Sequence, residues 1–240
     1  MKLFKTLSVL VLAIIVLQSF KKDHVNIWMI GDSTMAPKKK EVFPELGWGV
    51  ALSNFVNSNV TIHNHAVNGR STLSFINENG WKNVTDSIQP GDYVIIQFGH
   101  NDQKSKPDRH TEPFGSFKYN LEKFIAETRS HKATPVLCSS IVRRHFDGKG
   151  NLIDTHKDYI TAAQQVAKET GTDYVDMENL TRKLVLGLGP EGSKSIYNFT
   201  DKKQDSTHLN VNGAGVVAKL FVNDAQKRKL SIAKYFNDKK

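Results

Sequence analysis

The sequence of 240 residues contains a single cysteine, Cys138. One thiol excludes an intrachain disulfide framework and any metal site built from several cysteines. Proline and glycine are also modest, at 7 and 16 residues, which excludes collagen-like repeats and long disordered Pro/Gly-rich tracts. With 39% hydrophobic and 24% charged residues, the composition is that of one ordinary globular domain, because α/β domains of up to about 250 residues are routinely single.

The sequence also lacks a hydrophobic run long enough to cross a membrane. Its one extended apolar stretch, residues 7–17, follows a short basic segment, and as a helix it would reach only about 16 Å. This pattern is typical of a signal peptide. We therefore expect residues 1–22 to be a cleaved signal peptide, residues 23–240 to form a single domain, and the mature protein to be secreted or periplasmic. The alternative is an uncleaved anchor, because no clean cleavage site precedes Lys21.

An excess of positive charge is confined to the two ends of the chain. The net charge is +9, but residues 1–22 carry four lysines and no acid, and residues 227–240 carry six basic residues against one acid. The remaining residues include 23 basic and 23 acidic side chains. A nucleic-acid-binding domain carries its basic excess on the folded surface. We therefore expect no nucleic-acid partner. We also expect no integral membrane partner and a monomer.

Short runs rich in valine and isoleucine alternate with longer amphipathic segments along the chain. The predicted strands are residues 24–30, 60–65, 93–98, 135–139 and 174–176, and the predicted helices are residues 48–57, 71–79, 117–131, 155–170 and 213–223. This alternation predicts a parallel sheet of about five strands covered on both faces. The expected fold is an α/β protein, a three-layer α/β/α sandwich of the flavodoxin type. Its functional residues should lie in loops at the carboxyl ends of the strands.

Ser33 follows the first predicted strand and is a candidate nucleophile. A serine hydroxyl is weak unless a neighbouring base takes its proton. Asp205 and His208, three residues apart before the last predicted helix, could supply an imidazole that an acid orients. Each feature also has a structural explanation, since Asp32 or Ser33 could cap a helix and Asp205 and His208 could form a surface pair.

Two further loops contain candidate hydrogen-bond donors. Gly69 follows the second predicted strand and Asn101 follows the third. A bare backbone N–H and a side-chain amide aimed at one point would form an oxyanion hole, which stabilises the tetrahedral intermediate of acyl transfer. The alternative is that both residues simply favour tight turns.

The order of these pieces resembles the SGNH (GDSL-type) esterase and lipase superfamily. Its hallmark blocks stand here as Gly31-Asp32-Ser33, Gly69, Gly99-His100-Asn101-Asp102 and Asp205-Ser206-Thr207-His208. The resemblance implies the SGNH hydrolase fold, with Ser33 as nucleophile, His208 as general base and Asp205 as the residue that orients it. It also implies an oxyanion hole formed by Gly69, Asn101 and the N–H of Ser33. It requires no metal and no cofactor.

A narrower resemblance links the chain to the rhamnogalacturonan acetylesterases, which remove acetyl groups from pectic polysaccharides. The residues that carry it are 31–36, 47–49, 65–71 and 97–104. Acetylesterases acting on xylan share parts of this pattern, and Lys38-Lys39-Lys40 departs from it. The expected partner is therefore an acetylated polysaccharide or oligosaccharide. An acetylxylan esterase, another SGNH esterase or lipase, and a non-catalytic glycan-binding module are the alternatives.

Three residues are assigned to substrate binding: Arg70, Trp48 and His100. Arg70 lies beside the candidate donor Gly69, and an exposed tryptophan could stack on a sugar face. The lysines at 38–40 could meet uronate carboxylates in the same way as Arg70. The alternatives are that the tryptophan belongs to the core and that the lysine cluster is a solvated surface.

Overall fold

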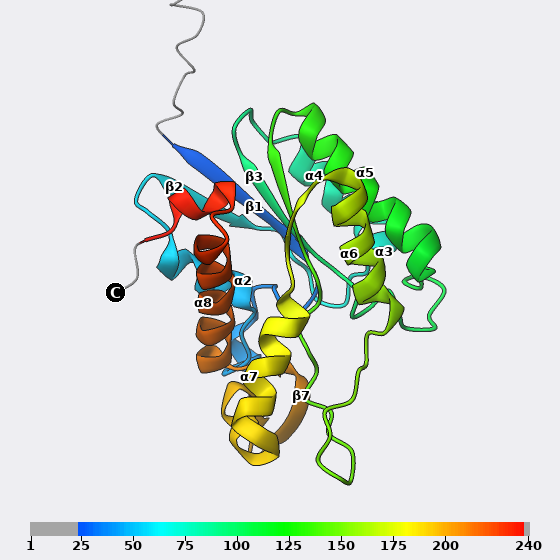
Figure 1. Cartoon of the computed structure of the whole chain (residues 1–240), viewed down its shortest axis with the longest axis vertical. Coiled ribbons are helices and arrows are strands. Elements are labelled where there is room, and N and C mark those ends of the chain that lie inside the picture. The colour runs from blue at the N-terminus through cyan, green and yellow to red at the C-terminus, as the bar shows by residue number, and fades with distance from the viewer. Residues whose placement is uncertain (1–23, 238–240) are drawn as a thin grey trace, which may run out of the picture.

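The computed structural model describes residues 24–237, so the predicted signal peptide lies outside the described residues. Five parallel strands form the central sheet in the order β2-β1-β3-β4-β5. Their bounds are β1 (Val25–Gly31), β2 (Val60–Asn64), β3 (Tyr93–Gln97), β4 (Thr134–Cys138) and β5 (Asp173–Val175). This is the flavodoxin-like order, and it confirms the predicted sheet (Figure 1).

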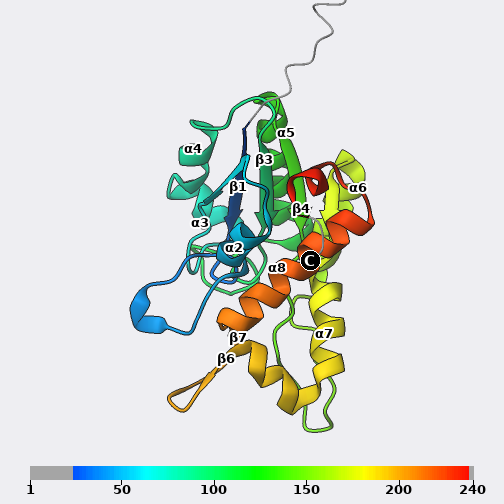
Figure 2. The same ribbon diagram turned by 90° about the vertical axis from the view of Figure 1, so that its left-hand side faces the viewer.

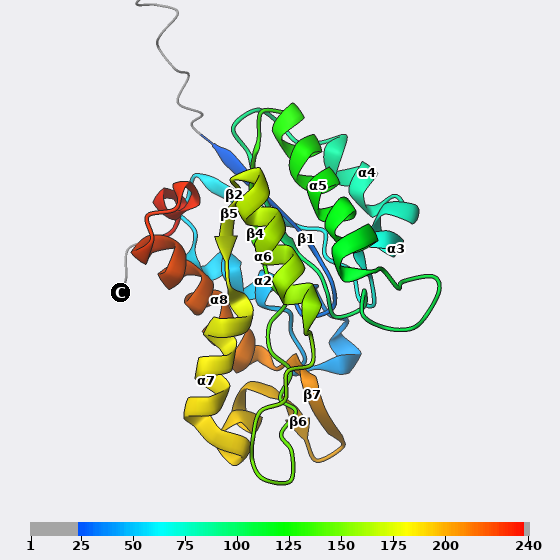
Figure 3. The same ribbon diagram turned by 45° about the vertical axis from the view of Figure 1, so that its right-hand side comes forward.

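Helices cover both faces of this sheet (Figures 1 and 3). One layer consists of α3 (Thr72–Asn77), α4 (Gly80–Thr85), α5 (Lys118–Ser130) and α6 (Asp158–Thr170), and the other of α2 (Trp48–Ala51), α7 (Met177–Gly192) and α8 (Val211–Lys227). Shorter turns are η1 (Lys40–Val42), η2 (Leu52–Phe55), η3 (Pro113–Phe117), η4 (Ser193–Ile196) and η5 (Ser231–Tyr235). Within residues 24–237, no helix combines the length and apolar character needed to cross a bilayer.

The alternation of side chains along β1 explains its continuous apolar sequence. Ile27 and Met29 pack into the core beneath α2 and α8, whereas Trp28 and Ile30 pack into the opposite core with residues of α4 and α5. Successive side chains of a strand point to opposite faces of the sheet. Because both faces are covered by helices, every position of the strand favours an apolar residue.

A second, antiparallel sheet was not predicted. It is a hairpin of β6 (Tyr197–Thr200) and β7 (Lys203–Leu209), and it places Asp205 and His208 on a strand just before α8. Polar residues dominate β7, so no apolar alternation signalled it. Helix α4 was also missed, and the predicted helix 48–57 is split into α2 and the 3-10 turn η2.

The start of α8 is fixed by a close backbone approach. Asn210 caps the helix through its side chain, which accepts the N–H of Gly213. A Cβ on Gly213 would lie 1.8 Å from the carbonyl oxygen of Ile196, whereas a Cβ on Gly215 would have no atom within 4 Å. The end of η4 and the helix α8 can therefore approach this closely only where the side chain is absent.

This difference predicts opposite effects for two substitutions in one helix. Gly213→Ala should lower the free energy of unfolding by about 1–3 kcal/mol, because a backbone carbonyl cannot move aside cheaply. Gly215→Ala should raise it by up to about 1 kcal/mol through helix propensity. Urea unfolding of both variants measures the two effects, and equal effects would contradict the close approach.

Candidate active site

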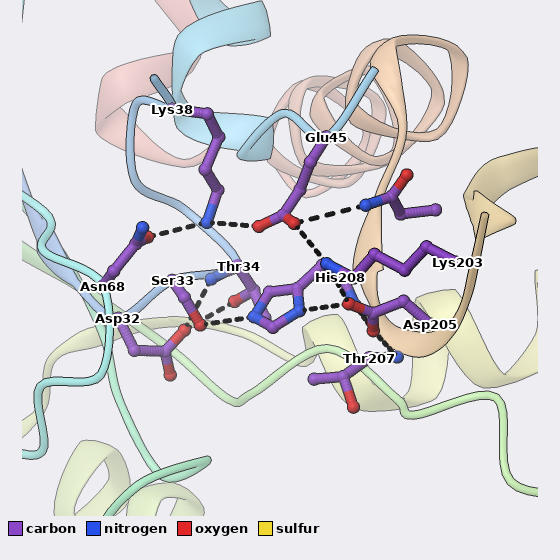
Figure 4. A network of polar contacts seen from close by, with 11 residues as sticks. Asp32, Ser33, Thr34, Lys38, Glu45, Asn68, Lys203, Asp205, Thr207 and His208 are labelled. Carbon is purple, nitrogen blue, oxygen red and sulfur yellow. Dashed lines mark hydrogen bonds and ion pairs between the residues drawn. The ribbon is translucent and has the colours of Figure 1, made fainter. Parts of the chain in front are cut away.

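Ser33, His208 and Asp205 form one hydrogen-bonded row, although 175 residues separate the serine from the histidine (Figure 4). His208 Nε2 lies 2.9 Å from Ser33 Oγ, and His208 Nδ1 lies 2.8 Å from Asp205 Oδ2. The serine comes from the turn after β1, and the other two residues come from β7. A carboxylate on Nδ1 leaves Nε2 free to accept the serine proton, which is the geometry of an activated nucleophile.

The carboxylate of Asp205 is held by its own turn. Asp205 Oδ1 accepts the N–H groups of Thr207 and His208, each at 2.9 Å, and Lys203 Nζ lies 2.9 Å from Oδ2. Partial burial by itself would raise the pKa of Asp205, but the hydrogen bonds from His208, Lys203 and Thr207 outweigh burial and hold this pKa well below its usual range. The residue therefore stays ionised at neutral pH and fixes the imidazole.

The turn that presents Ser33 is built on the buried carboxylate of Asp32. Asp32 Oδ1 accepts the N–H and the hydroxyl of Thr34 at 2.9 and 2.8 Å, and Oδ2 lies 3.1 Å from His100 Nδ1. Burial raises the pKa of Asp32, but the neighbouring His100 imidazole and the Thr34 hydrogen bonds lower it to about 2. The carboxylate beneath the serine is thus an ionised structural anchor.

The structure corrects two of the predicted substrate-binding residues. His100 is 2% exposed and contacts Asp32, and Trp48 is fully buried, where its Nε1–H donates to Gln97 Oε1 at 2.7 Å. Neither side chain has a surface to offer a glycan. Arg70 is partly exposed, and its guanidinium pairs with Glu78 and donates to the carbonyl of Asn68.

The two predicted oxyanion donors belong to loops that contact each other. Asn101 Nδ2 donates to the carbonyl of Arg70 at 3.0 Å, and its Oδ1 accepts Lys104 Nζ at 2.8 Å. Gly69, one residue earlier, has φ 77°, a backbone conformation that favours glycine. The side-chain amide nitrogen of Asn101 carries two hydrogens. One is donated to the carbonyl of Arg70, so the other remains for a ligand. Beside Gly69 lies the guanidinium of Arg109, a residue that the sequence did not single out.

Lys38 is not part of a solvated lysine patch, contrary to one reading of the sequence. Its side chain is 2% exposed, and its Nζ lies 3.0 Å from Glu45 Oε1 and 2.7 Å from Asn68 Oδ1. Lys39 and Lys40 are exposed. Glu45 was also missed, because a single acid in a loop carries no periodic or motif signal. Its pairing became visible only when the loop and the hairpin were placed together (Figure 4).

A cluster of possible metal ligands lies at the same place. Among the described residues, Glu45, Asp205 and His208 each offer one atom within 4.8 Å of the others. Lys38 and Lys203 already pair with Glu45, and Lys203 also pairs with Asp205. Two ammonium groups thus balance the two carboxylates, and the donor set does not fit a cation.

Asp102 anchors the loop that carries Asn101. Its Oδ1 accepts the N–H and hydroxyl of Thr72 at 3.0 and 2.6 Å, and the hydroxyl of Thr111 at 3.0 Å. Burial raises the pKa of Asp102 to about 7, and the Thr72 and Thr111 hydrogen bonds only partly oppose it. Unlike Asp32, it has only neutral partners in these contacts.

Comparison with known proteins points to an ester hydrolase family. The model of the GDSL-like lipase/acylhydrolase family matches residues 29–216. The chain is 35% identical to rhamnogalacturonan acetylesterase RhgT of Bacillus subtilis (strain 168) over 208 residues, which are 83% of this chain and 88% of that relative.

Solved structures share the fold. A crystal structure of the Bacillus subtilis protein YxiM aligns with 87% of this chain at a TM-score of 0.76 and 25% identity, and the chain spans 58% of its length. A variant of the acetylxylan esterase Axe2 from Geobacillus stearothermophilus aligns with 85% of this chain and 95% of its own, at a TM-score of 0.61 and 17% identity.

The state of Asp102 predicts a specific pH dependence of stability. Because its folded pKa of about 7 exceeds the ordinary value of 3.8, the folded protein keeps a proton that the unfolded chain releases. The free energy of unfolding should therefore fall as pH rises from about 4 to about 7. Asp102→Asn cannot ionise and should lose less stability over this range. Urea unfolding at several pH values measures the difference, and parallel curves would contradict it.

Proposed function

Because the chain belongs to the GDSL-like lipase/acylhydrolase family and is a carboxylic ester hydrolase, we propose that it removes O-acetyl groups from a plant cell-wall polysaccharide, with pectic rhamnogalacturonan as the preferred substrate. The observation that carries the proposal is the row of contacts from Ser33 through His208 to Asp205. The SGNH resemblance of the sequence is confirmed by the family model that matches residues 29–216 and by the relative at 35% identity.

The proposed reaction is a two-step acyl transfer. Ser33 Oγ attacks the acetyl carbonyl while His208 Nε2 takes the hydroxyl proton. The ester C–O bond then breaks, and His208 returns the proton to the departing sugar oxygen. Water attacks the acetyl-serine in the same way, which releases acetate and restores Ser33. Asp205 stabilises the imidazolium in both steps, and it stays ionised throughout.

The tetrahedral oxyanion needs preorganised donors, and three are proposed. They are the backbone N–H groups of Ser33 and Gly69 and the side-chain amide of Asn101. The hydrogen bond from Asn101 to the carbonyl of Arg70 supports this assignment, because it ties the amide to the Gly69 loop and fixes its orientation. Loss of one such donor typically costs about 10²–10³-fold in turnover.

An acidic glycan is favoured over a neutral one by the charges around these donors. The Arg109 guanidinium lies beside Gly69, and Lys104 contacts Asn101. Galacturonate carboxylates would pair with such cations. The relative at 35% identity is named a rhamnogalacturonan acetylesterase, whereas the acetylxylan esterase at 17% identity supports only the fold. Both observations favour the pectic substrate.

Acetate release tests the chemistry and the substrate together. The protein should release acetate from acetylated rhamnogalacturonan faster than from acetylated xylan. Ser33→Ala should lower turnover by at least about 10⁴-fold, because no other group supplies the nucleophile. Ser58→Ala, which changes an exposed serine, is the matched control.

The outcomes separate the alternatives. Release from xylan alone would keep the mechanism and contradict the preferred substrate. Activity that persists in Ser33→Ala would contradict the nucleophile. A folded protein that releases acetate from neither polymer would leave the lipid-esterase and glycan-binding alternatives in place of this proposal.

Export is a separate proposal, supported by the basic and apolar pattern of residues 1–22. When the chain is expressed with its own N-terminus in a bacterial host, the protein recovered from the periplasm or medium should begin near residue 23. N-terminal sequencing of the fractions measures this. Full-length protein in the membrane fraction would instead indicate an uncleaved anchor.

A further inference from the structure

A row of alternating charges continues from Asp205 through Lys203 and Glu45 to Lys38 (Figure 4). Lys203 Nζ lies 2.9 Å from Asp205 Oδ2 and 2.8 Å from Glu45 Oε2, and Glu45 Oε1 lies 3.0 Å from Lys38 Nζ. The side chains of Lys38 and Glu45 are 2% and 7% exposed. Burying charges is costly even when they are paired, so a stability role alone is a weak explanation for the buried Lys38–Glu45 pair. Lys203, whose side chain is 47% exposed, joins this pair to Asp205.

The row joins the three segments that build the candidate site. Lys38 and Glu45 belong to the loop between β1 and α2, and Lys203 belongs to β7, two residues before Asp205. Lys38 also donates to Asn68, the residue before Gly69. Figure 2 shows that the loop and the β6–β7 hairpin project from the same side of the molecule. The row thus connects the nucleophile turn, the Gly69 loop and the strand of the imidazole.

Lys203 is placed to hold Asp205. Residues 203 and 205 lie on the same side of β7, because side chains of a strand alternate. The ammonium group therefore bridges Asp205 to the buried Glu45, which Asn198 Nδ2 also contacts at 3.2 Å. Without this bridge, the imidazole of His208 is the one remaining hydrogen-bond partner of Asp205 Oδ2 among the described residues.

The row is also balanced in charge. It contains two carboxylates and two ammonium groups, and two contacts of 2.9 and 2.8 Å put Lys203 Nζ within about 6 Å of His208 Nδ1. Among the described residues outside the row, His100 interacts electrostatically with the imidazole of His208, and His100 is itself paired with Asp32. A change to one member of the row therefore alters the net charge beside His208.

We propose that Lys203 and Glu45, supported by Lys38, are positioning residues that hold the Asp205 carboxylate against His208 and balance the charge beside the imidazole. This inference rests on the proposed roles of Ser33, Asp205 and His208. It assigns none of the three residues a contact with substrate.

Charge balance predicts shifts of opposite sign for two variants. Lys203→Met removes a positive charge, so the imidazole takes up a proton more easily, and the acid limb of the kcat/KM profile should move to higher pH. Glu45→Gln removes a negative charge and should move that limb to lower pH. A unit charge at about 6 Å accounts for a shift of about 0.5 pH unit even in water. In the double variant the limb should return close to its wild-type position.

Positioning predicts a loss of rate in the same variants. Lys203→Met and Glu45→Gln should each lower kcat by about 10-fold or more with little change in KM, as is typical when a group that orients an active-site side chain is lost. Lys203→Arg should keep the wild-type acid limb and recover part of kcat. The double variant should stay slow, because its charge is restored but the bridge is not.

The assay uses glucose pentaacetate, a neutral acetyl ester with a sugar leaving group, so loss of a lysine cannot act through substrate charge. Lys202→Met is the matched control, because it changes an exposed lysine directly beside Lys203. Its profile should superimpose on that of the wild type. Thermal unfolding of each variant checks that it is folded. If Lys203→Met does not fold, the pH profile and kcat of Glu45→Gln test the proposal.

The outcomes are distinguishable. If the wild-type protein shows no Ser33-dependent hydrolysis of any ester, the proposed function is overturned and this inference with it. An active, Ser33-dependent wild type whose Lys203→Met and Glu45→Gln profiles match the control would overturn the inference alone. Limb shifts in the same direction for both variants would overturn it as well.

Discussion

Burial of both faces of the parallel sheet is the constraint on which the rest of this molecule depends. Because helices cover each face, the inner strands favour apolar side chains, as along β1 from Ile27 to Ile30. Those polar residues of the candidate site that come from the parallel sheet therefore lie in the loops after its strands. Gly69, Ser33 and Asn101 follow β2, β1 and β3, respectively. These three strands are neighbours in the sheet, so the topology alone brings their loops to one place.

Some polar side chains at the carboxyl edge of the sheet are still buried, and their hydrogen-bond and charge partners determine their protonation states. Asp32 and Asp102 are both fully buried, and burial raises the pKa of each. The neighbouring His100 imidazole helps bring the pKa of Asp32 down to about 2, whereas hydroxyl and amide partners leave the pKa of Asp102 at about 7. The two carboxyl groups are equally buried, so the identity of the neighbour determines which one carries charge.

Sequence reasoning predicted what depends on order and failed on what depends on burial. The order of the strands followed from the alternation of apolar runs and amphipathic segments, because a parallel sheet leaves few arrangements for them. The proximity of Ser33 to His208 was implied by the resemblance of the motif order to the SGNH superfamily. Trp48 and His100 were misassigned, since a residue type does not reveal whether its side chain reaches the surface. Glu45 was missed because two of its partners, Lys203 and Asn198, are distant in sequence, and no local pattern reports such pairing.

The hairpin shows why these distant contacts matter to the chemistry. Asp205 and His208 stand on a two-stranded element outside the main sheet, and such a hairpin is marginal by itself in water. Its geometry is fixed instead by anchors from elsewhere, such as the backbone bond from Arg144 N–H to the carbonyl of Ser206 and the ion pair of Lys203 with Glu45. The distance from His208 to Ser33 is therefore a property of the whole edge. It is set in part by residues outside the row of Ser33, His208 and Asp205.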